Sequence, residues 1–515
     1  MTSRDGHSWT PKYGLKSGVP SLSVISPSSN IGNTEVLYDV IVIGAGYCGL
    51  TAARNMAAEG LKVLLLEGRD RIGGCSWSSN IGGYPFEMGG TWVHWGQANT
   101  WREVLRYQME KDVEKTLDFS NGVKHFELNS LQGTVKMSHE DEVSRHRISW
   151  HLIVNAESQD ELIESGLKKF TNIDGVYGRK TIPLPHTTFH NPESIAMDFK
   201  SAQDRINEIA PTLSPQERTV LEASILLASG ATLEATSFHE LMHWWAMCGY
   251  TYQGWMDLLI TWKFRDGQST FARKFFEEAL STKRLNYSFN TPVKHIHDTG
   301  STVIIITRNH QTFRALRAIS TIPLNVLGSV TFEPLLPPGK LAAIATGHVN
   351  QTVKVHAEIS NQELRSWTGV TYPHNELNCG FGDGTTPAGN AHIVCFGAQN
   401  KHMDPEADIE VTKHAVSSLF NPIHYDGKEV EIERLVFHNW NKDEFAKGAW
   451  FFSPPKLLFE HLDDMRQRHG NILFANSDWA LGWRGFIDGA IGEGTRAGLE
   501  ARTDIHRLRE MRSNL

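Results

Sequence analysis

Cysteine is scarce in this chain. The five cysteines are scattered over 515 residues, and none belongs to a CxxC pair. Neither a zinc site nor a disulfide framework is therefore predicted, and we expect no metal centre. Unpaired thiols persist in reducing compartments, so an intracellular location is expected.

Positive charge and long apolar runs are also missing. The net charge is −8 and there is no basic run, which argues against nucleic acid or an anionic membrane surface as a partner. No window approaches the roughly 18 uncharged apolar residues of a membrane span, and the start of the chain lacks the apolar core of a signal peptide. The end, Ser513-Asn514-Leu515, differs at one residue from the peroxisomal S-K-L address. Peroxisomal and cytoplasmic locations both stay open.

The length exceeds that of one ordinary domain and suits two large, interleaved domains. Residues 1–36 are rich in Ser, Gly, Pro and Asn, and we expect an extended or mobile arm there. Residues 39–67 read as an apolar run, a glycine turn, an Ala-rich segment and a second apolar run. This order predicts a strand, a helix and a second strand that pairs in parallel with the first.

Two later segments also have a clear pattern. Charged helical stretches alternate with a Trp-dense region within 119–268. Residues 352–360, TVKVHAEIS, alternate with period two, which predicts a half-buried strand with Lys354 on its polar face.

The glycine turn is the first candidate binding site. Gly44, Gly46 and Gly49 form a GxGxxG motif between the predicted strand and helix, and Glu67 follows the second strand. Such glycines let the backbone approach a pyrophosphate at a helix N-terminus, while the acidic side chain accepts from a ribose hydroxyl. The alternative is a packing turn without a ligand.

Three motifs together carry a resemblance to a family. LLLEGRDRIGGCSW at 64–77, EMGGTWVHW at 87–95 and GWRGFIDGAIGEGTRA at 482–497 resemble the flavin-containing amine oxidases, the monoamine and polyamine oxidase group. The resemblance covers about 38–505 and looks closest to fungal soluble monoamine oxidases.

The resemblance implies an α/β fold, with a Rossmann-like FAD-binding domain of the glutathione-reductase type interleaved with an α+β substrate domain. We expect the FAD domain from 37–118, 269–343 and 443–505, the substrate domain from 119–268 and 344–442, and a C-terminal tail at 506–515.

The resemblance also assigns cofactor contacts along the chain. The expected FAD-binding residues are Gly44, Gly46, Tyr47, Cys48, Gly49, Glu67, Gly68, Arg69, Gly74, Cys75, Gly90, Thr91, Trp92, Pro292, Val293, Ala449, Asp478, Asp488, Gly489, Ala490 and Ile491. Asp488 would open the last helix beneath the flavin, and an ordinary N-cap is its alternative reading.

This sequence departs from the family's pattern at several of these positions. Gly68 replaces the usual Ala, and Cys75 replaces an Arg expected near the phosphates, which predicts weaker FAD retention. Asp478 stands for the usual Glu. Ala449 occupies the position of the Cys that bonds to flavin in mitochondrial members, so noncovalent FAD is expected.

The resemblance implies catalytic roles for three residues. Trp450 and Phe486 would form two walls of an aromatic cage, whereas Phe451 and Phe452 are assigned to the core. Lys354 would hold a water molecule against flavin N5. Without the family, plain packing of the rings and an ordinary solvated lysine are the alternatives.

The substrate pocket is expected in the Trp-dense region, from Trp244, Met256 and Ile260, with Trp245 beside them. Aromatic residues and methionine at helical spacing are also common in an ordinary hydrophobic core, which is the alternative interpretation. His94 is a further candidate, either as a catalytic base or as a packing residue.

The sequence thus predicts an FAD-dependent monoamine oxidase that takes a small amine and O2, and yields an aldehyde, ammonia and hydrogen peroxide. A polyamine oxidase is disfavoured because the Trp-rich stretch 244–262 has only Asp257 as an acidic residue. One further alternative is an amino-acid oxidase, in which Arg484 would bind the substrate carboxylate. Another is a non-catalytic protein with an FAD-binding fold. The oligomeric state, a homodimer included, is left open.

Overall fold

A computed structural model describes residues 1–32, 35–117, 123–140, 159–187, 189–420 and 430–513. Its first sheet is built around two parallel strands, β3 (Leu37–Ile43) and β4 (Val63–Leu66). They are joined through the glycine turn and α1 (Tyr47–Ala58), as the pattern predicted. The sheet is extended by β11 (Leu285–Ser288) beside β4 and by β14 (Thr312–Ser320) beside β3, and then by β13 (Val303–Thr307), β12 (Val293–Asp298) and β15 (Thr331–Glu333). The short strand β21 (Ile472–Phe474) pairs with β14.

The second sheet contains the strand that carries Lys354. Its order is β2 (Gly14–Pro20), β1 (Thr2–Thr10), β20 (Ile432–Phe437), β16 (Val353–Ile359), β19 (Ala391–Gly397), β18 (Cys379–Thr385), β17 (Trp367–Thr371), β8 (Val123–Ser130) and β9 (Gly133–Glu140). Two small ribbons pair β5 (Ser78–Ile81) with β6 (Tyr84–Glu87), and β7 (Val113–Lys115) with β10 (Trp262–Phe264).

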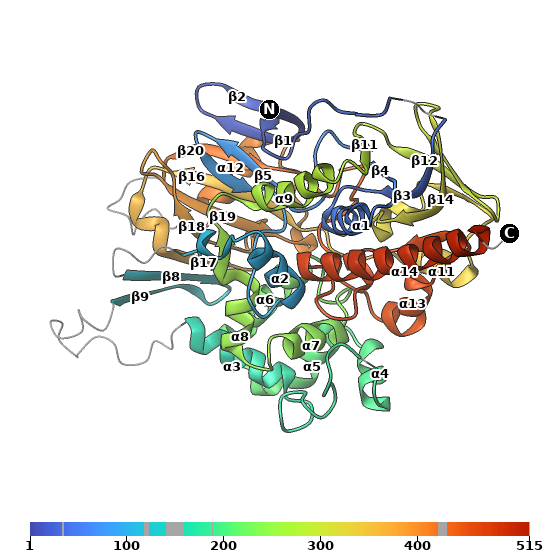
Figure 1. Cartoon of the computed structure of the whole chain (residues 1–515). Helices are drawn as coiled ribbons and strands as arrows, with labels where there is room; N and C mark the ends of the chain where they lie inside the picture. The colour runs from blue at the N-terminus through green and yellow to red at the C-terminus, as the bar shows by residue number, and fades with distance from the viewer. Residues whose placement is uncertain (33–34, 118–122, 141–158, 188, 421–429, 514–515) are drawn as a thin grey trace.

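Helices cover the first sheet and form a separate layer. Next to the first sheet lie α1, α2 (Ala98–Arg106), α9 (Gln268–Ser281), α10 (Leu324–Leu327), α11 (Pro338–Thr346), α13 (Leu457–Arg466) and α14 (Ile487–Ser513). The separate layer consists of α3 (Gln159–Thr171), α4 (Pro192–Asp198), α5 (Ala202–Ile209), α6 (Pro215–Ser229), α7 (Phe238–Met247) and α8 (Tyr252–Met256), most of which gather at the bottom of Figure 1. The helix α12 (Ile409–Ser417) packs on the second sheet.

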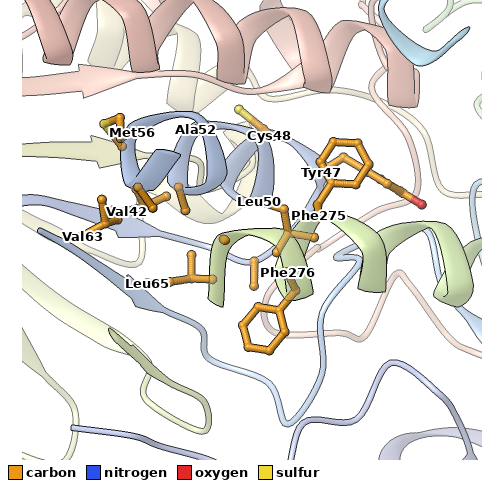
Figure 2. Packing of buried hydrophobic residues seen from close by; sticks show 14 of the residues in the cluster. Val42, Tyr47, Cys48, Leu50, Ala52, Met56, Val63, Leu65, Phe275 and Phe276 are labelled. Carbon is orange, nitrogen blue, oxygen red and sulfur yellow. The ribbon is translucent and has the colours of Figure 1, made fainter. Parts of the chain in front are cut away.

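The core beneath the glycine turn shows why this segment folds locally. Leu50 and Met56 of α1 pack on Val42 and Leu65 of the first sheet, and the aromatic residues of α9 close the cluster from the other side (Figure 2). Burial of these apolar side chains removes them from water and fixes the helix on the sheet. The turn at the start of α1 is thereby held in one position.

The N-terminal segment is not the mobile arm that its composition suggested. β1 and β2 form an antiparallel hairpin, and β1 pairs with β20 in the register Ser8 to Val436. Ser- and Gly-rich composition did not reveal this, because the pairing partner lies more than 400 residues away in the chain. The tail prediction was also wrong within the described residues, since α14 continues to Ser513. Residues 514 and 515 of the SNL end lie outside the described residues.

The half-buried strand prediction for 352–360 needs a second correction, because every residue of β16 is buried. The Val355 face packs on Ala415 and Val416 of the helix α12. The opposite face is covered by the β5–β6 ribbon, where His356 Nε2 donates to the Glu87 carbonyl at 2.7 Å. The alternation of apolar and polar residues in β16 therefore separates an apolar buried face from a polar buried face, and not a buried face from an exposed one.

A membrane-spanning helix must be both long and apolar, and this requirement can be applied to each described helix. None of them combines sufficient length with sufficient apolar character.

Candidate active site

One large cavity brings together segments that are far apart in the sequence. It reaches from the glycine turn between β3 and α1 to the helical layer. The predicted site residues that line it are Gly44, Gly46, Tyr47, Cys48, Glu67, Gly68, Arg69, Gly74, Cys75, Gly90, Thr91, Trp92, Trp244, Met256, Ile260, Pro292, Val293, Lys354, Ala449, Trp450, Asp478, Phe486 and Ala490.

The glycine turn has room for a ligand at one position and tight packing at two others. Gly44 has φ +106°, and a Cβ there would lie 2.3 Å from Thr321 Oγ1. A Cβ at Gly49 would lie 1.9 Å from the Gly44 carbonyl oxygen. Gly46 instead borders the cavity, and the nearest atom to its added Cβ would be Gly74 Cα at 3.7 Å. Gly44 and Gly49 thus shape the turn, and Gly46 leaves space beside the helix N-terminus, which fits a pyrophosphate.

Glu67 lies directly after β4, where it faces the same turn. Its carboxylate accepts from the backbone N–H groups of Ala45 at 2.6 Å and Arg69 at 2.9 Å. These bonds fix the carboxylate at the cavity wall. A carboxylate can accept about four hydrogen bonds, so capacity remains for the ribose hydroxyl of a dinucleotide.

Arg69 belongs to a buried ion-pair cluster. Its guanidinium donates to both carboxylate oxygens of Asp443 and lies 3.2 Å from Asp5 of β1. Burial alone would lower the pKa of Arg69, but the charges of Asp443 and Asp5 outweigh it and raise that pKa. Arg69 is therefore a fixed positive charge at the cavity wall.

The two departures at Gly68 and Cys75 have visible consequences. A Cβ at position 68 would lie 2.8 Å from the ring of Phe445, another cavity residue. The absence of a side chain at Gly68 therefore leaves room for the Phe445 ring. Cys75 borders the cavity, and burial raises its thiol pKa to about 11. A neutral thiol is a poor nucleophile, so a small neutral residue is the role that fits Cys75.

Four predicted cofactor residues do not line the cavity: Gly49, Asp488, Gly489 and Ile491. Asp488 accepts from the Thr100 N–H at 2.8 Å and from Asn99 Nδ2 at 3.0 Å, so it caps α2 rather than facing the cavity. A Cβ at Gly489 would lie 2.2 Å from the Trp483 carbonyl oxygen, and Ile491 is core.

Asp478 does face the cavity, beside Asn476. Its carboxylate accepts from the Leu324 N–H at 2.9 Å, and burial raises its pKa to about 6. Asn476 donates to the Thr321 carbonyl. The sequence therefore retains both a carboxylate and an ordered turn here.

Ala449 and the two predicted aromatic walls lie at the same cavity. Trp450 is anchored by a 2.9 Å hydrogen bond from Nε1 to the Ala228 carbonyl at the end of α6. Phe486 packs against Trp244 and Trp483, with ring centroids 4.7 and 5.2 Å away. Phe451 and Phe452 are fully buried outside the cavity lining, which confirms their assignment to the core.

Lys354 is held by three acceptors from one segment. Its Nζ donates to the carbonyls of Glu87 at 2.8 Å and Gly89 at 3.0 Å, and to Thr91 Oγ1 at 2.7 Å. Burial lowers the pKa of Lys354, and the carboxylates of Asp383 and Glu87 oppose that shift. The lysine is thus a cavity residue and not an ordinary solvated one.

Sequence reasoning missed the side chains that support Lys354. The Glu87 carboxylate accepts from the Gln268 N–H, and Gln268 Nε2 donates to the Thr91 carbonyl. Tyr47 donates in turn to Gln268 Oε1 at 2.7 Å. Glu87 stands in the EMGGTW motif, which was the available signal. Nothing local marks Gln268, since its partners come from other segments.

The Trp-dense region divides between cavity and core. Trp244, Met256 and Ile260 line the cavity, and Ile260 lies in a π-helical turn at Asp257–Thr261. Trp245 does not; its Nε1 donates to the Tyr177 carbonyl. Asp257 is also outside the lining.

His94 and Arg484 do not reach the cavity either. His94 accepts from the Gly96 N–H and stacks on Trp95, which supports the packing alternative. Arg484 is fully buried and pairs with Glu240 at 2.7 Å. It is therefore not placed to bind a substrate carboxylate.

Among the described residues, one buried group has metal-ligand chemistry, namely His356, Asp383 and His392. His356 Nδ1 and His392 Nε2 lie 2.8 Å apart, in a direct hydrogen bond, and His392 also lies 3.0 Å from the Tyr84 hydroxyl. The two rings thus satisfy each other without an ion.

A parallel-centred sheet, a glycine turn at a helix N-terminus and an acidic residue after the second strand define a dinucleotide-binding fold. The profile described as "Flavin containing amine oxidoreductase" matches residues 47–498. The chain belongs to this family, whose members are oxidoreductases that act on amines and use FAD.

Individual relatives match over nearly their whole length. Pseudooxynicotine dehydrogenase of a Pseudomonas species is 28% identical over 496 residues, covering 95% of this chain and 92% of that protein. Bovine flavin-containing amine oxidase B is 22% identical, covering 91% and 86%. The structure of cyclohexylamine oxidase from Brevibacterium oxydans has a TM-score of 0.71 at 18% identity, covering 92% of this chain and all of the other. The family prediction is confirmed; a particular closeness to fungal enzymes stays a prediction.

Proposed function

We propose that this chain is an FAD-dependent oxidase of small amines, which converts a primary amine and O2 to an aldehyde, ammonia and H2O2. Secondary and tertiary amines are alternative substrates. The observation that carries the proposal is the convergence of Lys354, Ala449, Trp450 and Phe486 on one cavity with the glycine turn.

The residues of the cavity fit the parts of FAD. Gly46 and the α1 N-terminus would take the pyrophosphate, Glu67 the ribose, and Pro292-Val293 the adenine. Ala449 offers no sulfur for a thioether, so the cofactor is bound noncovalently. When bound, FAD accepts a hydride equivalent from the carbon beside the amine nitrogen and passes two electrons to oxygen.

The aromatic walls would orient the substrate. Trp450 and Phe486 are fixed by different elements, α6 and the Trp244–Trp483 cluster. Flat side chains held in this way restrict a slender amine and keep water away from its reacting C–H bond. Hydride loss requires a neutral amine nitrogen, and the mostly apolar surroundings favour that form over an ammonium.

Lys354 would supply positive charge near the site of oxygen reduction. Its ammonium donates to the carbonyls of Glu87 and Gly89 and to the Thr91 hydroxyl, and these three hydrogen bonds fix the position of the charge. A preorganised cation stabilises the negative charge that develops on oxygen.

Two rival functions have less support. An amino-acid oxidase needs a cation for the substrate carboxylate, but Arg484 is paired with Glu240 outside the cavity. A non-catalytic binding protein would have no use for the Lys354 anchor and the aromatic walls together. A polyamine oxidase, which needs acidic residues in the cavity, stays an alternative, because Asp160 lines the cavity although Asp257 does not.

Anaerobic mixing with benzylamine tests the proposal. We expect the flavin absorbance to bleach, and H2O2 to form once air is admitted. Trp450→Ala should slow bleaching about tenfold or more through lost orientation, whereas Trp245→Phe, a change of a core residue outside the cavity, should leave it within about twofold. Flavin that stays oxidised with a broad panel of amines would refute the proposal.

A further inference from the structure

The segment 87–91, which supplies the acceptors of Lys354, is bound by the start of the helix α9. The backbone N–H of Gln268, the first residue of α9, donates to Glu87 Oε1 at 2.9 Å. Ser78 Oγ donates to the same carboxylate at 3.0 Å. The N–H groups of a first helical turn have no partner within the helix and lie at its positive end, so a carboxylate stabilises them. Glu87 therefore caps α9, and the backbone of α9 fixes one end of the segment.

The side chain of Gln268 holds the other end of this segment. Its Nε2 donates to the Thr91 carbonyl at 2.7 Å. The Thr91 hydroxyl accepts from Lys354 Nζ at 2.7 Å and donates to the Gly89 carbonyl at 3.0 Å. Gln268 itself is fully buried and does not line the cavity. Its side chain therefore acts on Lys354 through Thr91.

The orientation of the Gln268 amide is set by Tyr47. The Tyr47 hydroxyl donates to Gln268 Oε1 at 2.7 Å. Burial raises the pKa of Tyr47 well above its ordinary value, so the hydroxyl keeps its proton. A protonated phenol donates to the amide oxygen, which leaves the amide NH2 group for the Thr91 carbonyl. Tyr47, Gln268, Thr91 and Lys354 thus form one chain of hydrogen bonds in which each donor and acceptor is defined.

The middle of the segment has supports of its own. The N–H of Met88 donates to the Trp77 carbonyl at 2.9 Å, and the N–H of Gly90 donates to the Cys75 carbonyl at 2.9 Å. Neither bond involves α9. Loss of the amide should therefore leave the segment in place and release Thr91, so that its effect falls on the lysine and not on the fold.

We propose that Gln268 is a positioning residue for the reaction with oxygen: it holds the Thr91 hydroxyl against Lys354, so that the lysine charge stays at one point of the cavity wall. This inference rests on the proposed function and names the residue that keeps its cation in place. A charge that is already in position stabilises negative charge on oxygen without reorganisation. A displacement of about 1 Å can slow a reaction by up to about a hundredfold.

The test measures the oxygen reaction apart from the amine reaction. The purified holoenzyme is reduced anaerobically with light and EDTA, so that no amine is needed, and is then mixed with O2 in a stopped-flow instrument. Gln268→Met, which keeps the length but has no amide, should reoxidise about tenfold more slowly than the natural protein. The FAD affinity of the apoprotein, measured by flavin fluorescence, and anaerobic bleaching by benzylamine should be unchanged. A merely structural role would change all three measurements together.

Thr91→Val tests the route by which Gln268 acts. It removes the hydroxyl between Gln268 and Lys354, and it should also slow reoxidation. Gln268→Met added to Thr91→Val should slow the reaction no further, because the two changes interrupt the same chain of hydrogen bonds. Effects that multiply in the double variant would show that Gln268 acts by another route, and would overturn the inference.

Gln97→Met is the matched control. It makes the same exchange at another buried glutamine, which precedes α2 and does not line the cavity, and it should alter none of the three measurements. Tyr47→Phe is a second, milder variant. It removes the donor that orients the Gln268 amide but keeps the ring, which packs on Phe271 and Phe275. Reoxidation should slow by a smaller factor, and this result decides the question if Gln268→Met does not fold.

The outcomes separate this inference from the proposed function. If Lys354→Met reoxidises slowly while Gln268→Met and Tyr47→Phe are as fast as the natural protein, Gln268 is not a positioning residue. If Gln268→Met slows bleaching and loses FAD as much as it slows reoxidation, its role is structural and the inference is wrong. If no amine bleaches the flavin, the oxidase function fails, but the photoreduced protein still shows whether Gln268 acts on the oxygen reaction.

Discussion

The carboxylate of Asp5, in the strand β1, lies 2.9 Å from Nε of Arg71. The very start of the chain is therefore packed beside the segment that follows β4. Arg71 is fully buried, stacks over Trp77, and donates to the Gly74 carbonyl beside the glycine turn. Asp5 also pairs with Arg69, which lines the cavity. The N-terminal hairpin thus positions two guanidinium groups near the proposed phosphate site.

Asp5→Asn should weaken both folding and FAD binding. It leaves the buried charge of Arg71 with carbonyl partners alone, which should cost roughly 3 kcal/mol. Thermal unfolding and titration of the apoprotein with FAD, followed by flavin fluorescence, measure the two effects. Lys16→Gln, at an exposed site of the same hairpin, should change neither. Unaltered FAD affinity in Asp5→Asn would show that the hairpin is not part of the cofactor site.

Gly68→Ala should destabilise the cavity edge although Ala is the family's usual residue. The new methyl group would lie 2.8 Å from Phe445, whose ring is flanked by the guanidinium groups of Arg69 and Arg308 at 5.4 and 5.5 Å. Such overpacking costs about 1–3 kcal/mol. The double variant Gly68→Ala with Phe445→Leu should recover most of the loss in a denaturant titration. A single variant as stable as the natural protein would contradict this account.

Cys75→Arg tests the missing phosphate contact. A third guanidinium near Arg69 and Arg71 should raise FAD occupancy, because phosphate charge offsets the repulsion among the cations. The same repulsion should lower the melting temperature of the apoprotein. The ratio of flavin to protein absorbance after purification gives the occupancy, with Cys75→Ser as the neutral control. Equal FAD occupancy in the natural protein and both variants would show that residue 75 does not determine FAD retention.

Lys354→Met should slow the oxygen reaction roughly a hundredfold, as loss of a preorganised charge does elsewhere. Stopped-flow mixing of reduced enzyme with O2 measures this rate. Lys340→Met, which changes another buried lysine that does not line the cavity, is the control.

The pH dependence of the same reaction has a definite sign. Burial lowers the pKa of Lys354 from the ordinary value of 10.5. Its charge is therefore present at low pH and lost as pH rises through that lowered pKa. The rate should fall at a pH below 10.5 in the natural enzyme and stay level in Lys354→Met. A parallel fall in both proteins would assign the titration to another group.

Acid precipitation tests the noncovalent cofactor. Ala449 lines the cavity where a thioether would need a cysteine, so all yellow colour should pass into the supernatant. Colour that stays in the protein pellet would require another attachment point.

Sequence patterns predicted those parts of the molecule that depend on near neighbours. The order of β3, glycine turn, α1 and β4 follows from apolar runs and a motif within 29 residues, from 39 to 67. The same motif held Gly46, which faces the cavity, and Gly49, which packs under the turn, and local spacing could not tell the two apart.

Period two likewise placed Lys354 on one face of β16 but could not say what covers that face. The ribbon that covers it comes from residues more than 260 positions earlier, through the Glu87 carbonyl. A composition-based reading failed for the same reason at residues 1–36, where β20 supplies the missing partner.

By itself, the sequence determined the family and the cofactor class, because the βαβ unit and the flavin motifs are local signals. Only the tertiary structure decided that Asp5 pairs with Arg71 and that Asp488 caps α2. Charges and caps act across a few ångströms of space, and the chain brings such groups together only after it has folded.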